Sequence, residues 1–182
     1  YASQEAVDFA DLSMEAVSYY AIQASTDLAD VNLSDFTGKK VILNIFPSID
    51  TPTCAKSVRA FNEQAASMEN TVVLCISPDL PYAHKRFCEV ENIDNVIALS
   101  TFRTPEFGRD YGVTMISTQR RGLLARAVVV INEQGNVIYA KIVEELKDEP
   151  NYAEVLAAVK AGDTDGLDVC TQSGTAEHSR PG

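Results

Sequence analysis

Cys54 has the clearest potential for chemistry in this sequence, because it stands where a loop leaves a buried strand and a helix begins. The free N–H groups and the dipole at a helix N-terminus favour an anion, so this position stabilises a thiolate. A thiolate is a nucleophile that attacks the O–O bond of a peroxide, whereas a neutral thiol is a poor one. A free cysteine is also commonly a packed structural residue. Its position alone therefore leaves a reactive and a structural interpretation open.

Three other residues have the right chemistry to act on such a thiolate. Thr51 lies three residues before Cys54 and is able to place a hydroxyl beside the sulfur. Pro47 belongs to the same loop and restricts its backbone. Arg126 opens the apolar run RAVVVIN and either caps the surface or directs its guanidinium towards the thiolate. The sequence separation of Arg126 from Cys54 does not decide between these two roles.

The other three cysteines each need a separate interpretation. Cys75 lies inside the apolar run TVVLCIS, which predicts a packed core thiol. Cys170, in a polar tail, is interpreted first as a stray thiol, with an intermolecular crosslink or a second redox partner as the alternatives. Cys88 is four residues after His84 on a predicted helix, but two ligands do not make a zinc site, so no metal is expected. Four cysteines without a CxxC pair are typical of a reducing compartment and predict a cytoplasmic protein.

The hydrophobic pattern predicts the elements that must position these side chains. Short apolar runs predict strands, and apolar residues at helical spacing predict helices. The turn at 133–136 joins two apolar runs and predicts a hairpin. In chain order we expect strand 39–46, a helix with the stripe Val58, Phe61, Ala65 and Met68, strand 71–77, a helix from Pro81 with the stripe Ala83, Phe87 and Val90, strand 96–99, the hairpin, and a helix with Tyr152, Val155, Leu156 and Val159 on one face.

This order predicts an α/β fold of the thioredoxin-like type, with a central mixed sheet flanked by helices. Residues 1–160 are predicted to form one domain, and residues 161–182, rich in Gly, Asp, Ser and Thr, a polar C-terminal tail. The net charge of −11 argues against nucleic acid as a partner, and the absence of a long apolar run argues against a membrane.

The run NIFPSIDTPTCAKSVRAFN, residues 44–62, resembles the thiol peroxidase family of bacterial peroxiredoxins. It contains the general pattern Pro-x-x-x-Thr-x-x-Cys within a longer and much narrower string. Further matches follow in the family's order, so that the resemblance covers roughly residues 27–160. These matches are NTVVLCIS-x-DLP (70–81), RFC (86–88), NVI-x-LSTFR (95–103), YGV (111–113), GLLARAVVVI (122–131) and EP-x-Y (149–152).

The resemblance implies a role for each matching residue. Cys54 would be the peroxidatic cysteine, Thr51 would contact sulfur and peroxide, Arg126 would hold both, and Pro47 would shield the site from water. Cys88 would be the resolving cysteine, forming a disulfide with Cys54 in the same subunit. The resemblance further implies a homodimer without cofactor that reduces hydrogen peroxide and alkyl hydroperoxides and is itself reduced by thioredoxin.

Two segments depart from the family's pattern, and two other function classes occur on a thioredoxin-like fold. Residues 12–22 diverge, with Val17 where the family has proline, and residues 114–121 carry additional positive charge. A dithiol oxidoreductase of the thioredoxin kind would need a second cysteine at the position of Ser57. A catalytically silent binding module would be expected to have lost Thr51, Cys54 or Arg126, all of which are present.

Overall fold

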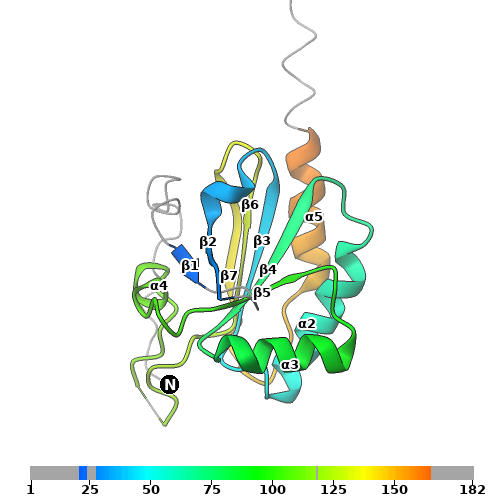
Figure 1. Ribbon diagram of the computed structural model, residues 1–182. Helices are drawn as coiled ribbons and strands as arrows, with labels where there is room; N and C mark the ends of the chain where they lie inside the picture. Colours follow the sequence, from blue (N-terminus) through cyan, green and yellow to red (C-terminus); the bar gives the residue numbers. More distant parts are fainter. Residues whose placement is uncertain (1–20, 24–27, 118, 165–182) are drawn as a thin grey trace, which may run out of the picture.

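The computed structural model describes residues 21–23, 28–117 and 119–164. Its centre is a five-stranded sheet in the order β5-β4-β3-β6-β7 (Figure 1). The strands are β3 (Lys40–Ile45), β4 (Thr71–Ser77), β5 (Ile97–Ser100), β6 (Ala127–Ile131) and β7 (Val137–Ile142). β3 pairs in parallel with β4 and antiparallel with β6, which makes the sheet mixed. The predicted strands and the predicted hairpin are confirmed.

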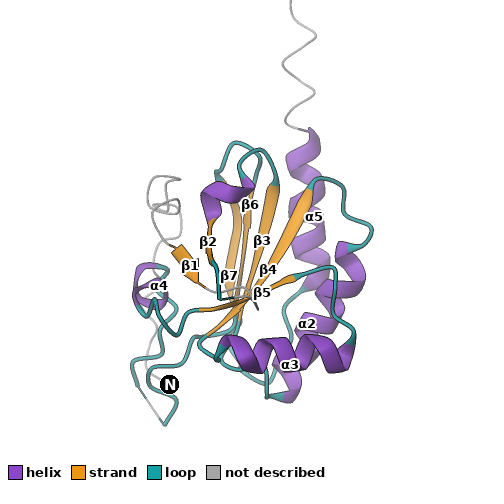
Figure 2. Cartoon of the chain, in the orientation of Figure 1, coloured by secondary structure: helices purple, strands orange, loops and turns teal. Residues whose placement is uncertain are grey.

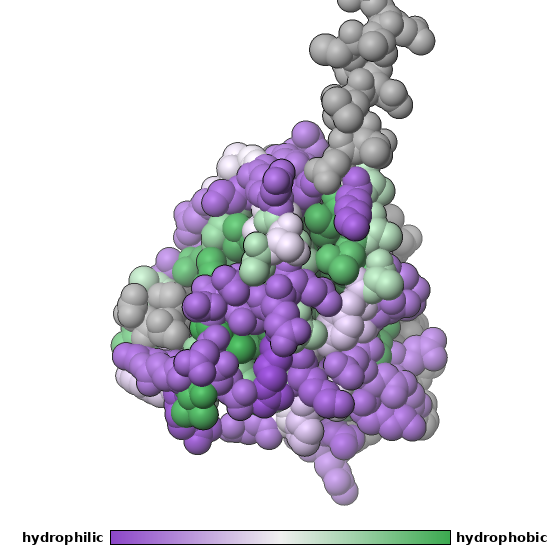
Figure 3. All heavy atoms as spheres, turned by 90° about the vertical axis from the view of Figure 1, so that its right-hand side faces the viewer, coloured by the Kyte–Doolittle hydropathy of each residue, from purple (hydrophilic) through white to green (hydrophobic). Residues whose placement is uncertain are grey.

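Three helices cover one face of the sheet, as Figures 1 and 2 show. They are α2 (Pro52–Ala65), α3 (Pro81–Glu91) and α5 (Tyr152–Thr164). Under them lies a buried apolar cluster that includes Phe46, Val58, Phe61 and Val155. The outer surface on this side is mostly hydrophilic (Figure 3), because the apolar stripes of the helices turn towards the sheet.

The opposite face of the sheet is covered by shorter elements that the periodicity did not predict. These are a two-stranded ribbon of β1 (Ala21–Gln23) and β2 (Asp30–Asn32), the 3-10 helix η2 (Leu33–Phe36) and the helix α4 (Glu106–Asp110). The two strands have three residues each, and the two helices have four and five residues. Elements of this length are too short to show a hydrophobic periodicity in the sequence. They bury the second apolar cluster, which includes Leu43, Ile45 and Phe107.

The predicted stripe of α3 was wrong at one position. Val90 is 72% exposed, and the buried residues of this helix are Pro81 and His84. The inward face therefore contains a polar histidine, which a search for apolar residues passes over. Among the other predicted stripe residues, Met68 lies beyond the end of α2 at Ala65 but remains partly buried.

The two ends of the chain bear on the predicted boundary between domain and tail. α5 continues beyond residue 160 to Thr164. Residues 1–20 and 165–182, with Val17, Cys170 and His178, lie outside the described residues. None of the described helices combines the length and the apolar character that crossing a membrane requires.

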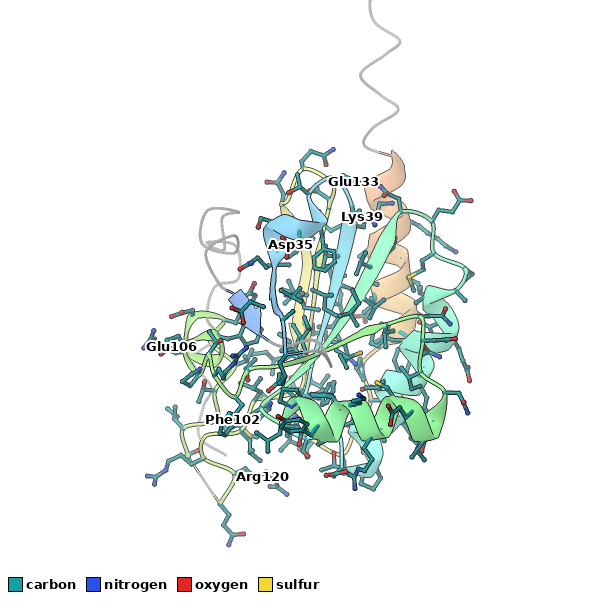
Figure 4. All side chains as sticks on the ribbon, in the orientation of Figure 1. Asp35, Lys39, Phe102, Glu106, Arg120 and Glu133 are labelled. Atoms are coloured by element: carbon teal, nitrogen blue, oxygen red, sulfur yellow. The ribbon has the colours of Figure 1, made fainter. Side chains whose placement is uncertain are left out.

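The two ends of the sheet differ in character. Lys39 and Glu133 mark the end where β3 begins and β6 finishes (Figure 4), and a shallow pocket there is lined by residues of both. Cys54 follows the opposite, carboxyl end of β3, from which the loop to α2 departs.

We predict that replacing Val129 in β6 by alanine lowers the free energy of unfolding by about 2–3 kcal/mol. The valine is fully buried, each lost buried carbon costs about 0.8 kcal/mol, and the cavity adds to this. Urea unfolding monitored by circular dichroism measures the change. The control is Val90→Ala on exposed α3 surface, with an expected change within about 0.5 kcal/mol. Equal losses in both variants would contradict this description of the core.

Candidate active site

The start of α2 places Cys54 in the first turn of a helix. Thr51 is the N-cap, with an extended backbone (φ −97°, ψ 143°), and Pro52 occupies the first helical position, where its fixed φ suits the helix. The N–H of Ala55 donates to the carbonyl of Thr51 at 3.0 Å, which closes the first turn. Cys54 is fully buried and its thiol is free. The sulfur therefore lies near the positive end of the helix dipole and away from solvent.

Arg126 supplies the positive charge beside this sulfur. Its Nη1 and Nη2 atoms each donate to Cys54 Sγ at 3.5 Å, and Nη2 also donates to the carbonyl of Leu146 at 2.9 Å. Arg126 is only 1% exposed. In the described part of the chain no carboxylate forms an ion pair with it. A buried cation is costly unless hydrogen-bond acceptors surround it, and the described acceptors of this guanidinium are the Cys54 sulfur and the Leu146 carbonyl.

The register of the sheet explains why these two residues meet across 72 positions of sequence. β3 and β6 are antiparallel, and Ala127 pairs with Ile45 at the end of β3. Arg126 precedes Ala127, so it lies beside the point at which the chain leaves β3 towards Cys54. The structure thus places Arg126 at the site and not as a surface cap.

Thr51 and Pro47 both lie in the loop before Cys54, but differ in surroundings. Pro47 is buried, next to the end of β3. Thr51 is exposed, and its hydroxyl donates to the carbonyl of Ser48 at 3.0 Å. This bond engages the hydroxyl proton, and no hydrogen bond joins Thr51 to the Cys54 sulfur in the described structure. The oxygen of Thr51 keeps its capacity to accept a hydrogen bond.

A buried polar chain beneath Cys54 was not recognised in the sequence. Ser57 donates to the carbonyl of Cys54 at 2.9 Å, and Asn44 Nδ2 donates to Ser57 Oγ at 3.2 Å. Asn44 is a fully buried residue near the carboxyl end of β3, and the residues around it in this run are apolar. This chain fastens the first turn of α2 to the sheet.

Cys75 forms part of the same buried floor and is confirmed as a core thiol. Asn44 Nδ2 lies 3.6 Å from Cys75 Sγ, in donor geometry. Burial raises the pKa of the Cys75 thiol to about 12. The group therefore stays protonated and is a weak nucleophile at neutral pH.

Cys88 is a free, half-buried thiol on α3, the helix next to α2. Burial, and secondarily Glu89, raise its pKa, so Cys88 remains protonated at neutral pH. Arg59 of α2 binds Glu91 of α3 through two hydrogen bonds of 2.8 and 3.0 Å, which ties the two helices together. The two sulfurs thus belong to neighbouring, connected helices.

Comparison with known proteins places this arrangement in a class. The sequence pattern of the Redoxin family matches residues 4–156, so the chain belongs to that family. A crystal structure of a peroxiredoxin-like protein from Aquifex aeolicus superposes with a TM-score of 0.73 at 39% identity, covering 78% of this chain and 82% of that one. The thioredoxin-like fold predicted from the sequence is confirmed.

A narrower relationship follows from a curated relative. The thiol peroxidase of Corynebacterium glutamicum is 53% identical over 135 residues, which are 74% of this chain and 81% of that protein. The structure of a thiol peroxidase from Chromobacterium violaceum shares the fold, with a TM-score of 0.70 at 18% identity over 80% of this chain and 84% of that one. Within the Redoxin family the chain is therefore a member of the thiol peroxidases, as the sequence resemblance indicated.

We predict that Arg126→Lys slows the reaction of Cys54 with peroxide by about tenfold or more. Lysine keeps the charge but loses the planar fork that reaches the sulfur and the Leu146 carbonyl together. Stopped-flow measurement of a single turnover with hydrogen peroxide gives the rate.

The matched control is Arg103→Lys, which alters an exposed arginine paired with Asp30 at 2.9 Å. It should leave the rate unchanged. A wild-type rate in Arg126→Lys would mean that the guanidinium geometry does not contribute to the peroxide step.

Proposed function

We propose that this chain reduces hydrogen peroxide and alkyl hydroperoxides through Cys54, resolves the product through Cys88 and is regenerated by thioredoxin. The observation that carries this proposal is the buried Cys54 sulfur, which receives both terminal nitrogens of Arg126 at 3.5 Å. The family of the chain supports the reaction class, and the geometry supports the residue assignments.

The first step oxidises Cys54. The thiolate attacks the terminal oxygen of the hydroperoxide, an S–O bond forms, and the O–O bond breaks. Cys54 becomes a sulfenic acid, while the other oxygen leaves as hydroxide or alkoxide and takes up a proton. Arg126 offers the thiolate its positive charge and has N–H donors for the oxygen that the sulfur acquires.

The loop residues have supporting roles in this step. Thr51 donates its hydroxyl proton to the carbonyl of Ser48, so its oxygen remains available to accept the O–H of a hydroperoxide. Pro47 is buried and lacks an N–H, so it excludes water from the approach to the sulfur without adding a donor. Together these residues orient the peroxide and limit competing hydration.

The second step joins Cys54 and Cys88. The Cys88 sulfur displaces the oxygen of the sulfenic acid, an S–S bond forms, and water leaves with the thiol proton. A disulfide needs Cα atoms within about 7 Å, and both cysteines start inside helices. We therefore infer that the first turn of α2, or the turn of α3 around Cys88, unwinds before the bond forms.

Regeneration and assembly complete the proposal. The dithiol of thioredoxin reduces the Cys54–Cys88 disulfide and is itself oxidised, which restores both thiols. We further propose a cytoplasmic homodimer in which residues 1–160 form the catalytic domain and residues 161–182 a polar tail. Light scattering at micromolar concentration tests the dimer.

Peroxide-dependent oxidation of NADPH, coupled through thioredoxin reductase and thioredoxin, tests the activity. We expect wild-type turnover and none in Cys54→Ser, because serine offers no polarisable nucleophile for the O–O bond. Cys170→Ser, in the proposed tail, is the control and should turn over at the wild-type rate. Retained activity in Cys54→Ser would refute the assignment of Cys54.

We predict that Cys88→Ser consumes one equivalent of peroxide and then stalls as Cys54 sulfenic acid. Without the resolving thiol the intermediate persists and becomes open to further oxidation. A dimedone adduct on Cys54, detected by mass spectrometry, measures it.

Peptide mapping of the peroxide-treated wild type completes this test. The expected product is a Cys54–Cys88 link within one subunit. A bridge from Cys54 to Cys75 or Cys170, or one between subunits, would contradict the proposed resolution.

A further inference from the structure

The carboxylate of Asp79, outside the residues assigned so far, gathers three donors from two parts of the chain. Ser48 Oγ donates to Asp79 Oδ1 at 2.8 Å, and the N–H of Ile49 donates to Oδ2 at 2.7 Å. Ser77 Oγ donates to the same Oδ2 at 2.5 Å. Two of these donors belong to the loop that leads into Cys54. Asp79 thus clamps that loop to the end of β4.

Ser48 in turn holds Thr51 through two hydrogen bonds. The carbonyl of Ser48 accepts the N–H of Thr51 at 3.2 Å and the hydroxyl of Thr51 at 3.0 Å. The hydroxyl of Ser48 also accepts the N–H of Asp50 at 3.2 Å. One residue held by Asp79 therefore fixes both the N-cap of α2 and the direction of the Thr51 hydroxyl.

Ser77 and His84 fix the orientation of the Asp79 carboxylate through a chain of two hydrogen bonds. A carboxylate only accepts hydrogen bonds, so Ser77 must donate its one proton to Asp79. His84 Nε2, which lies 2.9 Å from Ser77 Oγ, must then be the donor in that contact. Burial lowers the pKa of His84, which keeps the ring neutral and leaves Nδ1 without a proton. Nδ1 is buried and without a hydrogen-bond partner in the described structure, as this tautomer allows.

We propose that Asp79 is a positioning residue of the peroxide step, holding Thr51 and the start of α2 in their reactive arrangement through Ser48 and Ile49. The inference rests on the proposed function. Ser77 and His84 orient the carboxylate, and no hydrogen bond joins Asp79, Ser48, Ser77 or His84 to the Cys54 sulfur in the described structure. The consequence is that a residue of the β4–α3 connection controls the geometry of a site built by β3, α2 and β6.

Asparagine at position 79 tests this role because it keeps the shape and reverses part of the hydrogen bonding. The asparagine NH2 group would face either Ser48 Oγ or the two donors that now bind Oδ2. A donor would then face a donor, so at least one of the hydrogen bonds that hold the loop is lost. Removing a negative charge near the site would by itself stabilise the thiolate and speed the reaction. Loss of positioning has the opposite sign, since displacing reacting groups by about 1 Å costs up to about a hundredfold in rate.

The experiment measures the single-turnover rate with hydrogen peroxide in Asp79→Asn, Ser48→Ala and the double variant. We expect each single variant to be about tenfold slower or more, and the double variant no slower than the slower single one, because both break one restraint. Asp94→Asn, an exposed aspartate beyond α3, removes the same charge and should react at the wild-type rate. If Asp79→Asn does not fold, Ser48→Ala still tests the proposal. This variant loses only one half-exposed hydroxyl group, so we expect it to fold.

A spectroscopic readout separates positioning from general loss of structure. The sequence contains two histidines, so the ¹⁵N spectrum of the imidazoles is simple to assign. In the wild type we expect His84 as the Nε2–H tautomer, and a shifted Nε2 resonance in Asp79→Asn. Unchanged rates in Asp79→Asn or Ser48→Ala, multiplicative losses in the double variant, or an Nδ1–H tautomer would each overturn the proposal. Failure of the proposed function itself would be distinct, since the wild type would then not react with peroxide.

Discussion

The burial of the Arg126 guanidinium against Cys54 is the constraint on which the rest of the site depends. A cation removed from water needs an anion or a full set of acceptors, and Arg126 has one backbone carbonyl, that of Leu146, and one sulfur. No carboxylate of the described chain forms an ion pair with Arg126, so the sulfur and this carbonyl are its described acceptors. The fold thus brings the guanidinium and the sulfur together by burying both residues in its interior.

The other parts of the site adjust how firmly that sulfur is held. Asn44 and Ser57 hold the first turn of α2 from the sheet side, by polar contacts of 2.9–3.2 Å. Arg59 and Glu91 tie α2 to the helix that carries Cys88. The first turn of α2 is therefore held on the sheet both by this polar chain and by the burial of Cys54 in the apolar cluster that contains Val58 and Phe61.

Much of this was accessible from sequence, and the exceptions have physical reasons. The apolar runs predicted β3, β4 and β6, because strands that are buried on both faces of a sheet consist of nearly continuous hydrophobic residues. The position of Cys54 followed from the junction of such a run with a helix. The placement of Arg126 was implied only by the family resemblance, because the residue pattern alone does not reveal the antiparallel register of β3 and β6. Asn44 and His84 were missed since each is a polar residue that the fold buries among apolar neighbours.

The long separation between Cys54 and Arg126 has a consequence for a chain that is still being made. Cys54 leaves the ribosome before Arg126 has been synthesised, and the two meet only when β6 has docked against β3 across 72 residues of chain. Until then no guanidinium contacts the sulfur, whatever local structure the segment of α2 has reached. The candidate site is therefore completed by a long-range contact of the native topology, and local folding of α2 alone does not assemble it.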